Sequence, residues 1–125
     1  MYKLYILLLE LMQMKNKPAI NLNEPSFYIL LALSKEPMSG YELTRTIYDL
    51  TKGRLEVKTG TMYPTLKRLS EHQLIELIED QSQERNKKIY QLTDEGKQLL
   101  QTEVDLLNEK IEEVKSIMNK TEGGR

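Results

Sequence analysis

The sequence lacks cysteine and tryptophan and contains one histidine, His72. Without cysteine there are no disulfides, thiolate metal sites or cysteine nucleophiles, and the composition suits a reducing cytoplasm. One histidine leaves a transition-metal site short of nitrogen and sulfur ligands. The sequence has no glycine-rich phosphate loop after a predicted strand and no serine beside a candidate base. We therefore expect no enzyme, no bound metal and no cofactor, and we expect a cytoplasmic protein.

The sequence also lacks an excess of charge of either sign. Its 18 Lys and Arg residues oppose 19 Asp and Glu residues, for a net charge of −1, whereas DNA-binding domains are usually basic. The distribution is uneven, because residues 93–125 hold 5 basic against 8 acidic residues, and no acid lies between Lys58 and Ser70. Screening limits each charge to about 10 Å at 0.1 M salt, so this local surplus matters more than the net charge.

The sequence lacks a hydrophobic run long enough to cross a membrane. Residues 1–14 are strongly apolar, but they are too short to span a bilayer, and Lys3 and Glu10 interrupt them. We expect a helix that packs on the rest of the molecule or on a second copy. The alternatives are a targeting segment, or a natural start at Met12 or Met14 that leaves residues 1–13 outside the natural protein.

The middle of the sequence predicts three short helices followed by a β-hairpin. Pro25 begins the first helix, and Ser39 with Glu42 forms a capping box for the second, whose inner stripe is Leu43, Ile47 and Leu50. The third helix starts at residues 59–61 and ends near residue 72. Residues 74–79 and 88–92 are the strands, joined by a polar loop over residues 80–87.

This order of elements describes a mainly α (α+β) fold, a winged helix-turn-helix with a helical extension at each end. We divide the chain into residues 1–24 (N-terminal helix and linker), 25–93 (winged helix-turn-helix) and 94–125 (C-terminal dimerisation helix and tail). Tyr41 is expected in the core or supporting the helix cap, and Tyr90 is expected to be structural.

The last predicted helix carries a hydrophobic seam. Thr93 caps it, and apolar residues then follow at spacings of 4, 3, 4, 3 and 4: Leu100, Val104, Leu107, Ile111, Val114 and Met118. A repeat of 3.5 residues favours packing against another helix, which predicts a homodimer. The competing interpretation is an amphipathic helix folded onto its own domain.

Five segments between residues 27 and 100 together resemble the PadR family of transcriptional regulators. They are Leu30-Leu31-Ala32-Leu33, Gly40-Tyr41-Glu42-Leu43, Gly60-Thr61-Met62-Tyr63-Pro64-Thr65-Leu66-Lys67-Arg68-Leu69, Leu74-Ile75 and Lys88-Ile89-Tyr90-Gln91-Leu92-Thr93-Asp94-Glu95-Gly96. The single C-terminal helix resembles the short PadR subfamily. The resemblance implies a homodimeric repressor and places Thr61, Tyr63, Lys67 and Arg68 against DNA. Two departures are Gln73, where the family often has glycine, and a wing that contains Arg85-Asn86-Lys87-Lys88 in place of a Gly-Gly-Arg run.

On this interpretation the third helix enters the major groove of double-stranded DNA, and the wing contacts the flanking minor groove or the backbone. The candidate DNA-binding residues are Lys58, Thr59, Thr61, Tyr63, Thr65, Lys67, Arg68, Arg85, Lys87 and Lys88. Most of these side chains suit phosphates better than bases. Taken singly, each could also be an ordinary solvated residue.

The resemblance to the short subfamily also implies a small hydrophobic effector. Tyr2, Tyr5 and Met12, with the apolar residues of the last helix, are candidates to line its cavity, or they are ordinary dimer core. We expect a repressor that binds a pseudo-palindromic operator and has no membrane partner. The alternative is a winged-helix module that binds only protein.

Overall fold

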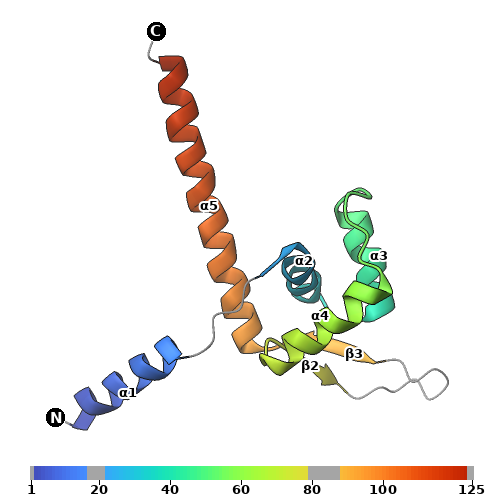
Figure 1. The fold of residues 1–125 in the computed structure, drawn as a ribbon, viewed down its shortest axis with the longest axis horizontal. Coiled ribbons are helices and arrows are strands. Elements are labelled where there is room, and N and C mark those ends of the chain that lie inside the picture. Colours follow the sequence, from blue (N-terminus) through green and yellow to red (C-terminus); the bar gives the residue numbers. More distant parts are fainter. Residues whose placement is uncertain (1, 17–21, 79–87, 124–125) are drawn as a thin grey trace.

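The computed structural model describes residues 2–16, 22–78 and 88–123 (Figure 1). It contains five helices and three strands in these ranges: α1 (Tyr2–Asn16), α2 (Glu24–Leu33), β1 (Met38–Ser39), α3 (Gly40–Leu50), α4 (Thr59–Glu71), β2 (Ile75–Ile78), β3 (Ile89–Leu92) and α5 (Asp94–Gly123). The predicted winged helix-turn-helix is confirmed. The predicted loop over residues 80–87 lies outside the described residues.

The three strands form one antiparallel sheet in the order β1-β3-β2. Ile75 pairs with Leu92, and Ile78 pairs with Ile89, so β2 and β3 make the expected hairpin. Met38 and Ser39 pair with Tyr90 and Ile89, which adds a third strand that the sequence did not predict. A strand of two residues is too short to show an alternation of apolar and polar side chains. It is recognisable as a strand only because it pairs with β3.

Local hydrogen bonds begin the helices where the sequence indicated. Ser39 Oγ accepts the Glu42 amide at 3.2 Å, and Glu42 Oε1 accepts the Ser39 amide at 3.1 Å, so the capping box is present. Thr93 Oγ1 accepts the Gly96 amide at 3.0 Å at the start of α5. The cap of α4 is neither Thr59 nor Thr61 but Lys58, which makes no side-chain capping hydrogen bond.

The core lies between α2, α3, α4, the sheet and the start of α5. Its fully buried members are Ile29, Leu30, Leu43, Ile47, Met62, Leu66, Leu69 and Ile75. Leu50 was expected on the inner stripe of α3, but half of it is exposed, because the helix ends there and its last turn projects beyond α2. Leu100 is buried in this same core, which ties the first two turns of α5 to the winged helix-turn-helix.

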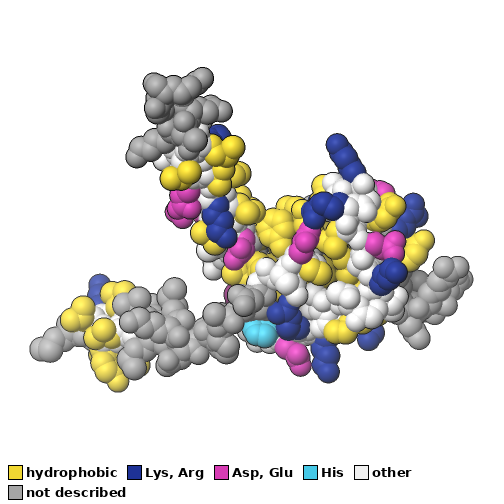
Figure 2. All heavy atoms as spheres, turned by 45° about the horizontal axis from the view of Figure 1, so that its top comes forward, with side chains coloured by type: hydrophobic (Ala, Val, Ile, Leu, Met, Phe, Trp, Pro, Cys, Tyr) yellow, Lys and Arg dark blue, Asp and Glu magenta, His cyan; other side chains and the backbone are white. Residues whose placement is uncertain are grey.

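Beyond Leu100, α5 extends away from the domain as a long single helix (Figure 1). The hydrophobic side chains of residues 106–118 on α5, and those of residues 2–9 on α1, lie on the surface of the chain (Figure 2). No helix among residues 2–16, 22–78 and 88–123 is long and apolar enough to cross a membrane.

Candidate nucleic-acid interface

The helix α4 has one buried face and one outward face. Met62, Thr65, Leu66 and Leu69 are buried, at the spacing of one helix face. Gly60, Pro64 and Lys67 lie on the opposite face and are exposed, with Thr61 and Tyr63 on its flanks. Because Glu71 is the first acid after Lys58, the outward face of the first three turns carries no negative charge.

Thr65 does not belong to the outward face, contrary to the sequence-based expectation. Only 7% of its surface is exposed, and its hydroxyl donates to the carbonyl oxygen of Thr61 at 2.6 Å. The helical repeat places Thr65 beside Leu66 and Leu69, so its hydroxyl is satisfied by its own helix. Thr65 is therefore a packing residue.

The N-terminus of α4 borders a shallow cavity of about 360 Å³ between α3 and α4, lined in part by Gly40, Tyr41, Lys58, Thr59 and Tyr63. The first turn of α4 contains no acidic residue and no side-chain cap, so its partial positive charge faces this cavity. Lys58 is exposed, and its Nζ lies 3.9 Å from Glu56 Oε1. Helix N-termini of this kind bind phosphate groups.

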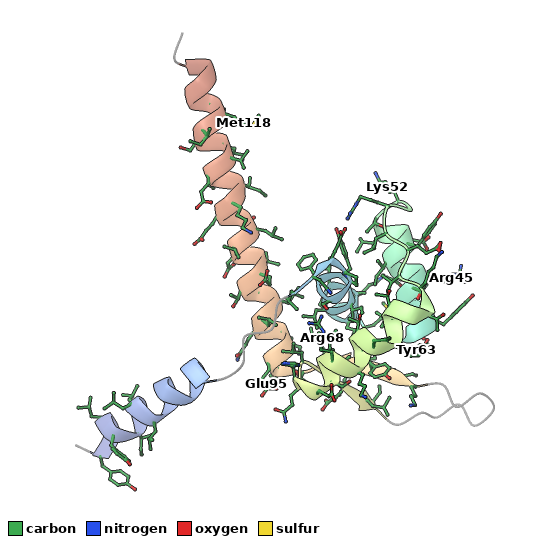
Figure 3. All side chains as sticks on the ribbon, in the orientation of Figure 1. Arg45, Lys52, Tyr63, Arg68, Glu95 and Met118 are labelled. Carbon is green, nitrogen blue, oxygen red and sulfur yellow. The ribbon has the colours of Figure 1, made fainter. Side chains whose placement is uncertain are left out.

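Tyr63 lies where α4, α3 and the sheet meet (Figure 3). Its side chain is 55% exposed, and its ring borders Gly40 at the start of α3. Tyr90 on β3 is half-buried; burial raises its pKa above the ordinary tyrosine value, and the nearby Tyr63 raises it further. Tyr90 packs against the core, as expected for a structural residue.

The wing is described only at its base. Lys88 is exposed immediately before β3. Further along the strand pair, Gln91 Nε2 on β3 donates to Glu76 Oε1 on β2 at 2.7 Å. Arg85 and Lys87 lie outside the described residues.

Arg68 turns away from the outward face of α4 and toward α2. Its Nη2 donates to Ser26 Oγ at 2.5 Å. His72 is the C-terminal cap residue of the same helix. Its Nδ1 hydrogen-bonds to the Arg68 carbonyl oxygen at 2.9 Å, so its side chain helps to end α4.

Two residues were missed when the sequence was interpreted alone. Gly60 faces open space, since a Cβ atom added there would have no heavy atom within 4 Å, so a DNA backbone could approach it closely. Tyr41 was expected in the core or supporting the helix cap; it is 69% exposed at the mouth of the cavity, so it is not a core residue. The capping box directs position 41 outward because the next residue must reach back to Ser39, and that box was the available signal.

The residues predicted to form the dimer seam and the effector site do not all lie on one surface. Val104 is half-buried, whereas Leu107, Ile111, Val114 and Met118 are exposed on one line along α5. Leu100 is a core residue and not a free member of this seam. Tyr2 and Tyr5 are exposed on α1, and the side chain of Met12 lies outside the described residues. The part of the chain that is described holds no group of three His, Asp or Glu residues placed to bind a metal ion.

Comparison with known proteins identifies the class. Residues 29–102 match the model of the transcriptional regulator PadR-like family, and the chain belongs to this family. It is 38% identical over 86 residues to the transcriptional regulator YqjI of Escherichia coli, a match that spans 66% of this chain but 40% of that protein.

Solved structures give the same result. A PadR-like transcription factor from Bacteroides fragilis is 33% identical, with a TM-score of 0.61 over 73% of this chain and 86% of that one. Bacillus subtilis PadR, solved in complex with operator DNA, is 30% identical, with a TM-score of 0.60 over 67% of this chain and 48% of that one.

Proposed function

We propose that this chain is a homodimeric repressor that binds a pseudo-palindromic operator through α4 and the wing. The observation that carries the proposal is the acid-free outward face of α4, which begins at an uncapped helix N-terminus. The DNA-bound Bacillus subtilis relative supports double-stranded DNA as the ligand.

The chemistry of this face suits the DNA backbone first and the bases second. The amides of Thr59 and Gly60, the Thr59 hydroxyl and the Lys58 ammonium can bind one phosphate at the cavity between α3 and α4, which Glu56 also lines. Lys67 lies two turns further along the outward face and is placed for the major groove or its edge. Thr61 and Tyr63 supply neutral hydroxyl groups on either side.

The base of the wing supplies a second point of contact. Lys88 is exposed at the start of β3, and Arg85 and Lys87 precede it in the sequence. Cations at this position would bind the backbone that flanks the site read by α4.

The exposed seam of α5 supports the dimer. Leu107, Ile111, Val114 and Met118 would otherwise leave a long apolar line in water. A two-fold pair of such helices presents two copies of α4, which requires an operator with two half-sites related by the same symmetry.

We further propose that a small hydrophobic effector regulates this protein and binds to the exposed apolar side chains of α1 and α5. The support is the set of exposed apolar side chains on α1, including Tyr2 and Tyr5, together with the half-buried Val104. Binding there would act on DNA affinity through the dimer, because the seam on α5 sets the distance between the two α4 helices.

The direct test is fluorescence anisotropy with an inverted repeat from the gene's own promoter, over a series of salt concentrations. The affinity should fall steeply with salt, and Lys67→Ala should reduce the slope by about 0.9 for each phosphate that is no longer neutralised, with two copies of the substitution in a dimer. Glu109→Ala, on the opposite side of α5 from the seam, is the control and should leave the slope unchanged. Binding that is weak and independent of salt would favour the protein-binding module instead.

A further inference from the structure

Arg68 makes a hydrogen bond within the protein, to the helix α2, that has no part in contacting DNA. Its Nη2 donates to the hydroxyl of Ser26, which lies 42 residues earlier in the sequence and is fully buried. Arg68 itself is half-buried and lies between α4 and α2 (Figure 3). A charge-assisted hydrogen bond to a buried acceptor is well shielded from solvent, so it is stronger than a surface ion pair.

Ser26 is a buried acceptor on an ordered part of the backbone. Its backbone amide donates to the Asn23 Oδ1 cap of α2 at 3.0 Å, which holds the Ser26 backbone in the first turn of α2. The neighbouring Ile29 and Leu30 are fully buried, which holds α2 in the core. The Arg68 contact therefore joins α4 to a fixed part of the domain.

A second arginine joins the segment before α4 to the same part of α2. Arg54 pairs with Glu24, and its Nη2 donates to the Tyr28 hydroxyl at 2.7 Å. The pair is largely exposed and is therefore the weaker of the two contacts. Together, Arg68 on α4 and Arg54 in the segment before α4 contact the first two turns of α2.

We propose that Arg68 is a positioning residue for DNA recognition: it holds the recognition helix to α2 through Ser26 and does not bind the DNA itself. This inference rests on the proposed function. Without the contact, the buried face of α4 still holds the helix in the core, but its orientation against α2 is less well fixed, and a smaller fraction of the molecules is ready to bind. The apparent affinity falls in proportion to that fraction, whereas the number of phosphates neutralised stays the same.

The experiment compares operator affinity and its salt dependence for the wild-type chain, Arg68→Ala, Arg68→Lys, Ser26→Ala and the double variant Arg68→Ala with Ser26→Ala. Lys67→Ala, which removes a neighbouring cation from the outward face, is the matched control. Circular dichroism sets a temperature at which every variant is fully folded, so that weaker binding does not reflect unfolding.

We expect Arg68→Ala and Ser26→Ala each to weaken operator binding about tenfold with the salt slope of the wild type. The double variant should lose less affinity than the sum of the two single losses, because both single substitutions remove the same hydrogen bond. Arg68→Lys should not restore binding, since a lysine keeps the charge but loses the planar guanidinium group.

Three outcomes would overturn the inference. A lower salt slope in Arg68→Ala, with rescue by Arg68→Lys and no effect of Ser26→Ala, would make Arg68 a phosphate contact. Wild-type affinity in all folded Arg68 and Ser26 variants would make the contact purely stabilising. If the wild-type chain shows no salt-dependent operator binding, both the proposed function and this role of Arg68 are wrong. The wild-type chain is therefore measured first, before any variant is compared.

Discussion

Gln73 occupies a backbone position that usually belongs to glycine. Its φ is 59°, in the left-handed region, where a side chain approaches its own backbone closely. The reason is the end of α4: the Leu74 amide donates to the Leu69 carbonyl oxygen at 3.0 Å, and the Gln73 amide donates to the Ser70 carbonyl oxygen at 2.9 Å. This paired closure turns the chain from α4 into β2. The strain at Gln73 is thus a consequence of where the recognition helix must stop.

Replacing Gln73 with glycine should stabilise the protein. The substitution removes left-handed strain but makes the unfolded chain more flexible, so we expect the free energy of unfolding to rise by up to about 1 kcal/mol. Urea unfolding followed by circular dichroism measures the change. Gln73→Ala keeps the strain and serves as the control, and equal stability of the two variants would contradict this account.

At the scale of elements, contacts at the start of α5 set the distance between this helix and the sheet. Thr93 is central to this junction, because its amide donates to the Leu74 carbonyl oxygen at 3.1 Å and its hydroxyl donates to the Gln73 carbonyl oxygen at 2.7 Å. Gly96 lies against the same segment before β2, and a Cβ atom there would overlap the carbonyl oxygen of Leu74 and come within 2.8 Å of Leu92 Cδ1. Only glycine lets α5 approach the sheet this closely.

Gly96→Ala should therefore destabilise the protein by about 1–3 kcal/mol, the usual range for overpacking, because the overlapping atom belongs to the backbone and cannot rotate away. Gly60→Ala is the matched control, since a Cβ at Gly60 meets open space. It should add about 0.5–1 kcal/mol through the better helix propensity of alanine. Thermal unfolding of both variants makes the comparison, and a loss of stability at Gly60 equal to that at Gly96 would refute the packing argument.

At the scale of the whole molecule, α5 has two roles along its length. Leu100 packs into the core of the winged helix-turn-helix, whereas Ile111 and Val114 lie on an exposed line where the helix extends beyond the domain (Figure 1). The first part fixes the direction of the helix, and the second part is available to a second chain. A two-fold pair built this way would hold two copies of α4 at a set spacing.

Ile111→Asp should shift the protein from dimer to monomer at micromolar concentration, because a carboxylate in a helix seam must be desolvated without a partner. Sedimentation equilibrium measures the change. Ser116→Asp introduces the same charge away from the seam and should leave the dimer intact. An Ile111→Asp protein that still sediments as a dimer would contradict the seam assignment.

Interactions between residues close in the sequence determined much of this protein in advance. The Ser39–Glu42 capping box, the Thr93 cap and the hydrophobic periodicity of α4 and α5 each act within a few residues, so they could be interpreted without a tertiary structure. These features were enough to predict the winged helix-turn-helix.

Contacts between distant residues were decided only by the tertiary structure. Thr65 and Arg68 both read as DNA-facing in the sequence, yet one packs in the core and the other binds Ser26 on α2. Leu100 belongs by spacing to the dimer seam but by burial to the domain core, and β1 exists only because β3 pairs with it. The physical reason is the same throughout: periodicity assigns a residue to a face of its helix, and the neighbouring element then determines whether that face meets solvent, the core or a hydrogen-bond acceptor.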